Sequence, residues 1–314
     1  MPSPVDVGLD ERGRVYVLDR EASAVRVFSH GGATWTTLDP ASIGHPLSRG
    51  AWGMAVAGSG AVYVWDPQRQ GILVFPPSPR RPFSFTVLGR SYGLPVPIEV
   101  SDSAEVMVSV LRPGPAAVQE TAIFFDQRGR RRRDLGPFPV VSSMTVTGRS
   151  TRSTVTLPFD LATRTVLALA PTGDVAMADS RGHHVSVVRG TDTLFTAAHA
   201  GDEVPVLSGD VKNALALAPT GISERDVRRL LPRSKSPIVE LLLSTDWLLV
   251  RRPVLTQYTH RTKYDLYRIG SSTPCVTLVL APRILAARGQ YLAGISLRDA
   301  GTPAVEVLRL WRLP

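Results

Sequence analysis

Histidine and carboxylate side chains are the groups of this sequence best suited to bind metals or transfer protons. Two of the six histidines are adjacent, His183 and His184, and they follow Gly182 in a predicted turn. No two histidines have the spacing of a zinc-binding helix motif, and the full set is His30, His45, His183, His184, His199 and His260. The sequence has no nucleophile elbow, phosphate-binding loop or dinucleotide-binding fingerprint. We therefore interpret His183 and His184 as solvated turn residues, and the sequence identifies no catalytic residue, metal site or cofactor.

Three aspartates recur in one local pattern that could be mistaken for a carboxylate site. Each stands six residues after a glycine, at Gly13–Asp19, Gly60–Asp66 and Gly173–Asp179. Each Asp ends a predicted strand, where its carboxylate can accept hydrogen bonds from the amides of the next turn. Copies of one repeat lie in different structural units, which separates them in space. We therefore predict that Asp19, Asp66 and Asp179 cap turns and do not meet at a substrate.

The densest cluster of charge is Arg130, Arg131, Arg132 and Arg133, in a chain with a formal net charge of +9. Arginine binds phosphate through two donors, so this cluster is a candidate polyanion patch. Lysine is rare, however, which fits a biased coding background, and no aromatic side chains alternate with the arginines for base stacking. We expect the four arginines to lie together on a solvated outer loop.

A repeated hairpin positions these residues. Residues 13–19, 60–66 and 173–179 each read as a strand, and an apolar residue nine positions after each Asp closes a second strand. Degenerate copies occupy residues 104–126, 247–269 and 291–310. Several copies are about 45 residues apart, the length of a four-stranded propeller blade. A lone hairpin is marginally stable in water, so the copies must stack and share a core. The pattern predicts an all-β fold, a six-bladed β-propeller that occupies residues 1–314 as one domain.

Two local features depart from the repeat. Ser223 is suited to cap a helix, Asp226 stands three residues later and Pro232 follows as a stop, which predicts one short inserted helix near residues 223–231. Residues 284–287, 291–297 and 304–311 supply only three strands for the last blade. We therefore expect an incomplete sixth blade, or a natural start upstream of Met1 whose N-terminal segment, with or without an export signal, is absent from this sequence.

The segment Gly13–Asp19, followed by Val25-Arg26-Val27-Phe28, resembles the NHL-like repeat of bacterial six-bladed propellers. In that repeat a glycine, an apolar strand ending in Asp and a second strand ending in Phe recur. The resemblance implies a propeller fold in which residues 4–10 include the innermost strand of the first blade. The family includes peptide, RNA and sugar binders as well as a few lyases and lactonases, so the resemblance does not assign a function.

The sequence favours a non-catalytic binding or interaction scaffold whose partner is a protein, a glycan or a small molecule. Two alternatives stay open: a metal-dependent hydrolase or lyase with its site in the central channel, and RNA or polyanion binding through the arginine-rich face. The chain has no apolar run of membrane-spanning length and no signal peptide as written, so we expect a soluble protein of unassigned compartment. Its single cysteine, Cys275, excludes an intramolecular disulfide.

Overall fold

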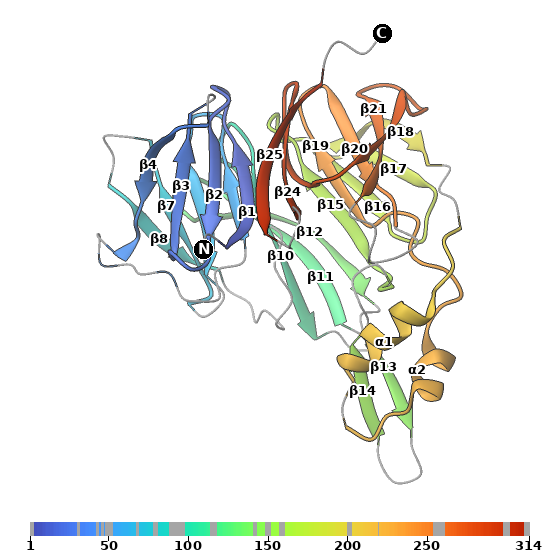
Figure 1. Ribbon diagram of the computed structural model, residues 1–314. Coiled ribbons are helices and arrows are strands. Elements are labelled where there is room, and N and C mark those ends of the chain that lie inside the picture. The colour runs from blue at the N-terminus through green and yellow to red at the C-terminus, as the bar shows by residue number, and fades with distance from the viewer. Residues whose placement is uncertain are drawn as a thin grey trace.

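The computed structural model describes most of the chain. All structural statements below concern residues 3–29, 32–41, 44, 47, 53–66, 69–77, 81–87, 98–113, 118–140, 143–147, 152–156, 161–199, 203–218, 220–253, 261–297 and 302–310. Six antiparallel β-sheets account for most of these residues, and each sheet forms one blade of a β-propeller (Figure 1). The predicted all-β, six-bladed fold is therefore confirmed.

The first three blades each contain four strands among the described residues. The first blade is β1 (Pro4–Leu9), β2 (Val15–Asp19), β3 (Ala24–Phe28) and β4 (Thr34–Leu38). The second is β5 (Gly53–Val56), β6 (Val62–Asp66), β7 (Gly71–Phe75) and β8 (Phe83–Thr86). The third is β9 (Ile98–Val100), β10 (Val106–Pro113), β11 (Val118–Phe125) and β12 (Arg131–Val140).

The last three blades differ in the number of strands. The fourth blade is β15 (Thr165–Leu169), β16 (Val175–Asp179), β17 (His184–Arg189) and β18 (Asp192–Ala198). The fifth is β19 (Glu240–Leu243), β20 (Trp247–Arg251), β21 (Thr262–Arg268) and β22 (Val276–Leu280). The sixth is β23 (Arg283–Arg288), β24 (Tyr291–Leu297) and β25 (Pro303–Arg309), so the described residues give it the three strands that the sequence predicts.

The innermost strand of every blade runs along the central axis. These strands are β1, β5, β9, β15, β19 and β23, and each contacts the next around the ring. Because β23 also contacts β1, the first and last blades meet and the ring closes. The innermost strands are parallel to one another around the axis, since each opens its blade. We call the side on which they begin the strand-start face, and the side on which they end the strand-end face.

Apolar clusters between neighbouring blades form the core. Leu18 and Val25 of the first blade pack with Met54 and Val64 of the second, and Val7 of the first blade packs with Ala293 of the sixth. The repeated pattern explains this arrangement, because the apolar strands β2, β6 and β16 present side chains to a neighbouring blade on each side.

Two insertions leave the strand-start face between the third, fourth and fifth blades (Figure 1). The first contains the hairpin β13 (Ser143–Thr147) and β14 (Arg152–Thr156), and the second contains α1 (Ser208–Ala216) and α2 (Glu224–Leu230). α1 contacts both α2 and β14, so the two insertions pack together. Helix α2 confirms the predicted helix: Ser223 Oγ accepts a hydrogen bond from Asp226 N at 3.3 Å. No helix among the described residues is long and apolar enough to cross a membrane.

The predicted position of the arginine cluster is wrong in one respect. Arg131, Arg132 and Arg133 lie on β12, the outermost strand of the third blade, and only Arg130 precedes it in a turn. The misplacement has a physical origin, since Asp126, Gly129 and Arg130 close a tight hairpin turn in which Asp126 N donates to Arg130 O at 2.9 Å. The turn is complete before Arg131, so Arg131 and Arg133 pair with β11, and the register shifts between them.

The three repeated aspartates each accept backbone hydrogen bonds in the turn that follows their strand. Asp19 Oδ1 accepts from Glu21 N at 3.1 Å and from Ala22 N at 3.2 Å. Asp66 Oδ1 accepts from Arg69 N at 3.3 Å, and Asp179 Oδ1 accepts from Arg181 N at 2.9 Å. Such contacts are those that a turn cap makes.

We predict that replacing Asp19 by Ala lowers the free energy of unfolding by about 1–2 kcal/mol, because the turn amides lose their acceptor. Urea unfolding measures this difference. Asp246→Ala is the matched control, since Asp246 is exposed and makes no side-chain hydrogen bond or ion pair with a described residue. Equal stability of the two variants would contradict a capping role for Asp19.

Candidate binding site in the central channel

The innermost strands carry charged side chains to the channel. Asp6 lies on β1, Glu99 on β9, Glu240 on β19, and both Arg283 and Arg288 on β23. An innermost strand has no neighbouring strand on its axial side, so its amides and carbonyls on that edge need other partners. Two of these carboxylates supply them. Asp6 Oδ2 accepts a hydrogen bond from Met54 N of the second blade at 2.7 Å, and Glu99 Oε2 accepts one from Leu169 N of the fourth blade.

Both of these carboxylates titrate far above their ordinary range. Burial is the main cause, and it raises the pKa of Asp6 to about 7 although Met54 N and Val7 N donate to it. Burial likewise raises the pKa of Glu99 to about 8, against the hydrogen bond from Leu169 N. The negative charge of Glu240 raises both pKa values further, which places the three carboxylates within electrostatic range across the channel.

Glu240 is the centre of the charged cluster at the strand-start face. Its Oε1 accepts a hydrogen bond from Arg283 Nη2 at 2.9 Å, and its Oε2 forms an ion pair with Arg251 Nε at 2.7 Å. Burial would raise the pKa of Glu240, but Arg251, Arg283 and Arg164 together outweigh burial and hold it below the ordinary value. Glu240 is therefore ionised and fixes two guanidinium groups at the start of the channel.

Arg164 adds a third guanidinium group to this cluster. It immediately precedes β15, and its backbone is held by Ser180: Arg164 N donates to Ser180 Oγ at 3.0 Å, and Ser180 N donates to Arg164 O at 2.8 Å. Burial lowers the pKa of Arg164, while the negative charges of Glu120 on β11 and of Glu240 stabilise its charged form. The cluster at the strand-start face is thus Glu120, Arg164, Glu240, Arg251 and Arg283, with Asp6 deeper in the channel.

Arg181 secures the insertions beside this cluster. Its Nη2 donates to Leu161 O at 3.1 Å and its Nη1 donates to Ser234 O at 2.9 Å. Leu161 belongs to the connection that carries β13 and β14, and Ser234 to the connection that carries α1 and α2. One side chain therefore ties both insertions to the fourth blade on the face where Glu240 lies.

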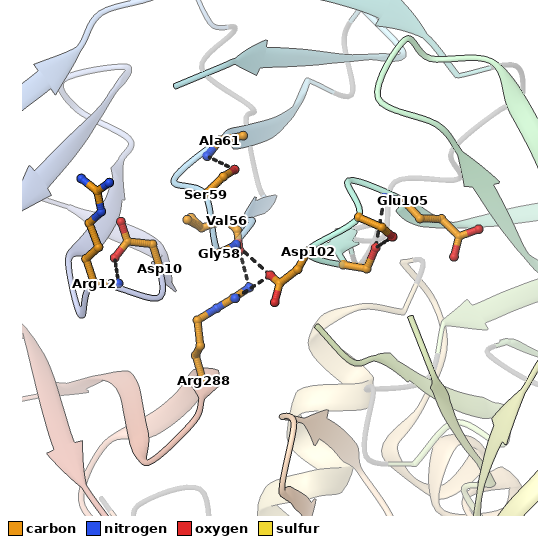
Figure 2. Close-up of polar contacts among 11 residues, drawn as sticks. Asp10, Arg12, Val56, Gly58, Ser59, Ala61, Asp102, Glu105 and Arg288 are labelled. Atoms are coloured by element: carbon orange, nitrogen blue, oxygen red, sulfur yellow. Dashed lines mark hydrogen bonds and ion pairs between the residues drawn. The ribbon is translucent and has the colours of Figure 1, made fainter. Parts of the chain in front are cut away.

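A different arrangement spans the channel at the strand-end face (Figure 2). Arg288 reaches from the sixth blade to the third, where its Nη1 donates to Asp102 Oδ1 at 2.6 Å, and its Nη2 donates to Val56 O of the second blade at 3.2 Å. Asp102 Oδ1 also accepts from Gly58 N at 2.9 Å. A Cβ on Gly58 would lie 2.5 Å from Glu11 Oε1, 2.6 Å from Arg288 Nη1 and 2.7 Å from Asp102 Oδ1, so a larger residue there would displace these side-chain ends.

The residues singled out from the sequence lie away from this cluster. Asp19, Asp66 and Asp179 end the second strands of their blades, one strand out from the innermost. His183 and His184 are exposed, whereas His30, His45 and His260 lie outside the described residues. Among the described residues, no group of three or more His, Cys, Asp or Glu side chains is arranged to hold a metal ion.

The four arginines of the predicted polyanion patch are all paired with carboxylates. Arg130 and Arg132 form ion pairs with Asp126 at 2.8 and 3.1 Å, and Arg133 forms one with Glu105 at 3.0 Å. Arg131 is paired with Asp134. Much of the positive charge that the sequence places in this cluster is therefore neutralised locally.

The buried His199 takes part in a polar network between the fourth and fifth blades. Its Nε2 lies 3.2 Å from Pro237 O, and its Nδ1 lies 3.2 Å from Tyr267 Oη and 3.3 Å from Asp265 Oδ2. Burial lowers the pKa of His199 despite the carboxylate of Asp265. Arg252 Nε donates to the same carboxylate at 2.7 Å. His199 is satisfied on both ring nitrogens, which identifies it as part of the packing between blades.

Comparison with known proteins supports the fold. No family model matches the sequence, and no curated protein matches it significantly. A putative exported protein from Bacteroides fragilis is 9% identical, with a TM-score of 0.50, and the match covers 95% of this chain and 80% of that one. Virginiamycin B lyase from Staphylococcus aureus is 8% identical over 97% of this chain and 84% of the lyase, with a TM-score of 0.45. The WD40 repeats of RRP9 match with 10% identity, 94% and 87% coverage and a TM-score of 0.46.

The raised pKa of Asp6 leads to a prediction about stability. Because the folded-state pKa of about 7 exceeds the ordinary value of 3.8, the folded protein retains a proton that the unfolded chain releases between these pH values. The free energy of unfolding should therefore fall as pH rises from about 4 to about 7. Asp6→Asn keeps an oxygen acceptor for Met54 N but cannot ionise. We therefore expect the free energy of unfolding of this variant to fall by about 1–3 kcal/mol less than that of wild type over this pH range.

Urea unfolding at about pH 5 and about pH 8 checks this expectation. The difference between wild type and Asp6→Asn isolates the Asp6 contribution, because Glu99 titrates in both proteins. Parallel pH profiles for the two proteins would contradict the assignment.

The ion pair across the strand-end face can be measured with a double-mutant cycle of Arg288→Met and Asp102→Asn. The Arg288 side chain is 11% exposed and the Asp102 side chain 36% exposed, so we expect a coupling of about 0.5–2 kcal/mol. Asn at position 102 retains an acceptor for Gly58 N. The exposed pair Arg228 and Glu224 on α2 provides the comparison, with an expected coupling of about 0.5 kcal/mol or less. Equal coupling in the two pairs would show that Arg288 does not close the channel end in solution.

Proposed function

We propose that the chain is a single-domain, NHL-like propeller that acts as a non-catalytic binding scaffold, with its ligand site at the strand-start end of the central channel. The partner is a small molecule, or an extended group of a glycan or protein that reaches into the channel. One observation supports this site most directly: the Arg283 side chain is oriented by an ion pair and is still accessible.

Arg283 combines fixed orientation with open donors. Glu240 holds it through Nη2, yet the side chain is 52% exposed. Its Nε and Nη1 make no hydrogen bond with a described residue. A guanidinium group that is pre-oriented loses little conformational entropy when it binds a ligand, which favours recognition.

The difference between the two ends of the channel also favours a ligand site at the strand-start face. Arg288 spans the strand-end face through its contacts with Asp102 and Val56, which favours the strand-start end for a ligand. The two insertions also lie on the strand-start face, where they can contribute contacts to a bound partner. Concave sites with a few positioned polar groups are typical of ligand binding in propellers and other closed folds.

The two alternative functions receive less support. A metal-dependent hydrolase or lyase needs several ligands in one place, and the described residues offer no such group. RNA or polyanion binding through Arg130 to Arg133 competes with the carboxylates that already pair with these arginines.

The test is a thermal-shift screen of the full chain against peptides, oligosaccharides and charged or neutral metabolites, with hits repeated on Arg283→Gln. We expect ligands that raise the Tm of wild type to raise that of Arg283→Gln by less than half as much, while mass spectrometry recovers them unchanged. Ligands that stabilise both proteins equally would place the site elsewhere. Conversion of a ligand into a product would overturn the assignment as a non-catalytic scaffold.

A further inference from the structure

The cluster around Glu240 contains more cationic than anionic groups. Three guanidinium groups, those of Arg164, Arg251 and Arg283, face the carboxylates of Glu120 and Glu240. Asp6 and Glu99 lie further along the channel and carry less than their full negative charge near neutral pH, because burial raises the pKa of Asp6 to about 7 and that of Glu99 to about 8. The cluster therefore has an excess of positive charge in the absence of a ligand.

The anionic groups of this cluster are already committed. Both oxygens of Glu240 contact arginines, Oε1 with Arg283 and Oε2 with Arg251. Glu120 is 3% exposed and stabilises the buried Arg164 electrostatically. The accessible group is Arg283, whose side chain is 52% exposed and whose Nε and Nη1 make no hydrogen bond with a described residue.

We propose that the strand-start end of the channel binds an oxyanion, the carboxylate or phosphate group of a small ligand, with Arg283 as the residue that contacts it. This inference rests on the proposed binding function and specifies its ligand class. A planar guanidinium group donates two parallel hydrogen bonds to a carboxylate or phosphate, a match that neutral ligands do not offer. An oxyanion also compensates the excess positive charge, whereas an ammonium group would increase it.

The surroundings of Arg283 make this interaction stronger than one on the open surface. Glu240, Tyr264 and Asp6 all lie within electrostatic range of its guanidinium group. Because the side chain is 52% exposed, protein groups replace part of the water around it, and the lower local dielectric on that side strengthens a charge-assisted hydrogen bond. Glu240 limits the affinity, because it already satisfies part of the positive charge of Arg283.

The experiment is isothermal titration calorimetry of the full chain with three probes: inorganic phosphate, succinate and the uncharged succinamide. We expect phosphate or succinate to bind, and succinamide to bind at least tenfold more weakly. A preference for phosphate or for succinate shows whether the site binds a phosphate group or a carboxylate group. Arg283→Gln should weaken binding of the preferred anion at least tenfold, and Arg283→Lys should retain part of it.

Arg268→Gln is the matched control, because it removes the same charge from an exposed residue at the strand-end side of β21. Its affinity should equal that of wild type. Glu240→Gln provides a variant with the opposite expectation. Its amide oxygen can still accept from Arg283 Nη2 and keep that side chain oriented, while the loss of the competing negative charge should strengthen anion binding by about threefold or more. Circular dichroism and Tm establish that each variant is folded.

Three results would overturn the inference: equal affinity of Arg283→Gln and Arg268→Gln, equal affinity for succinate and succinamide, or weaker anion binding by a folded Glu240→Gln. If the thermal-shift screen finds only neutral ligands whose binding depends on Arg283, the binding function stands and an oxyanion is excluded as the ligand. Absence of both anion binding and ligand hits that depend on Arg283 would refute the site itself.

Discussion

The closure of the ring depends on how the axial edges of the innermost strands are held. These edges have no neighbouring strand on the channel side, so side chains must connect one blade to the next. Asp6 links the first blade to Met54 of the second, Glu99 links the third to Leu169 of the fourth, and Glu240 of the fifth pairs with Arg283 of the sixth. These charged groups therefore bridge three of the six blade interfaces, and an apolar cluster packs each of the six.

This method of closure has a thermodynamic cost that depends on protonation. Backbone hydrogen bonds stabilise a carboxylate in a buried position, but burial removes the hydration that its ionised form needs. The pKa of Asp6 rises because the loss of hydration is the larger effect. Glu240 avoids the penalty because two arginines neutralise it. The same ion pair that links the fifth and sixth blades therefore also exposes a cation to the channel. Closure and recognition share Arg283, so mutations there are expected to affect both, and conservative variants are needed to separate them.

The repeated part of the fold was predictable from the sequence, whereas the channel was not. The spacing from Gly13 to Asp19 recurs because every second strand ends in the same turn, and this regularity identifies the blades. The innermost strands are short and lack a common motif: Asp6 is the third residue of β1, Glu99 the second of β9 and Glu240 the first of β19. Helix α1 was missed for a similar reason, since its N-cap is Leu207 and not a side chain that normally caps. Charged residues at irregular offsets give no periodic signal, and only the closed ring brings them together.

Two arginines of nearly equal exposure show why position in the fold decides the role of a charge. The Arg132 side chain is 57% exposed on the outermost strand of the third blade, and that of Arg283 is 52% exposed on the innermost strand of the sixth. Arg132 faces bulk water, where an ion pair contributes little because the solvent screens it. Arg283 lies within electrostatic range of Glu240, Tyr264 and Asp6, and its partial burial reduces screening. The denser arginine cluster in the sequence is therefore the weaker candidate for specific recognition, and a single arginine at the ring axis is the stronger one.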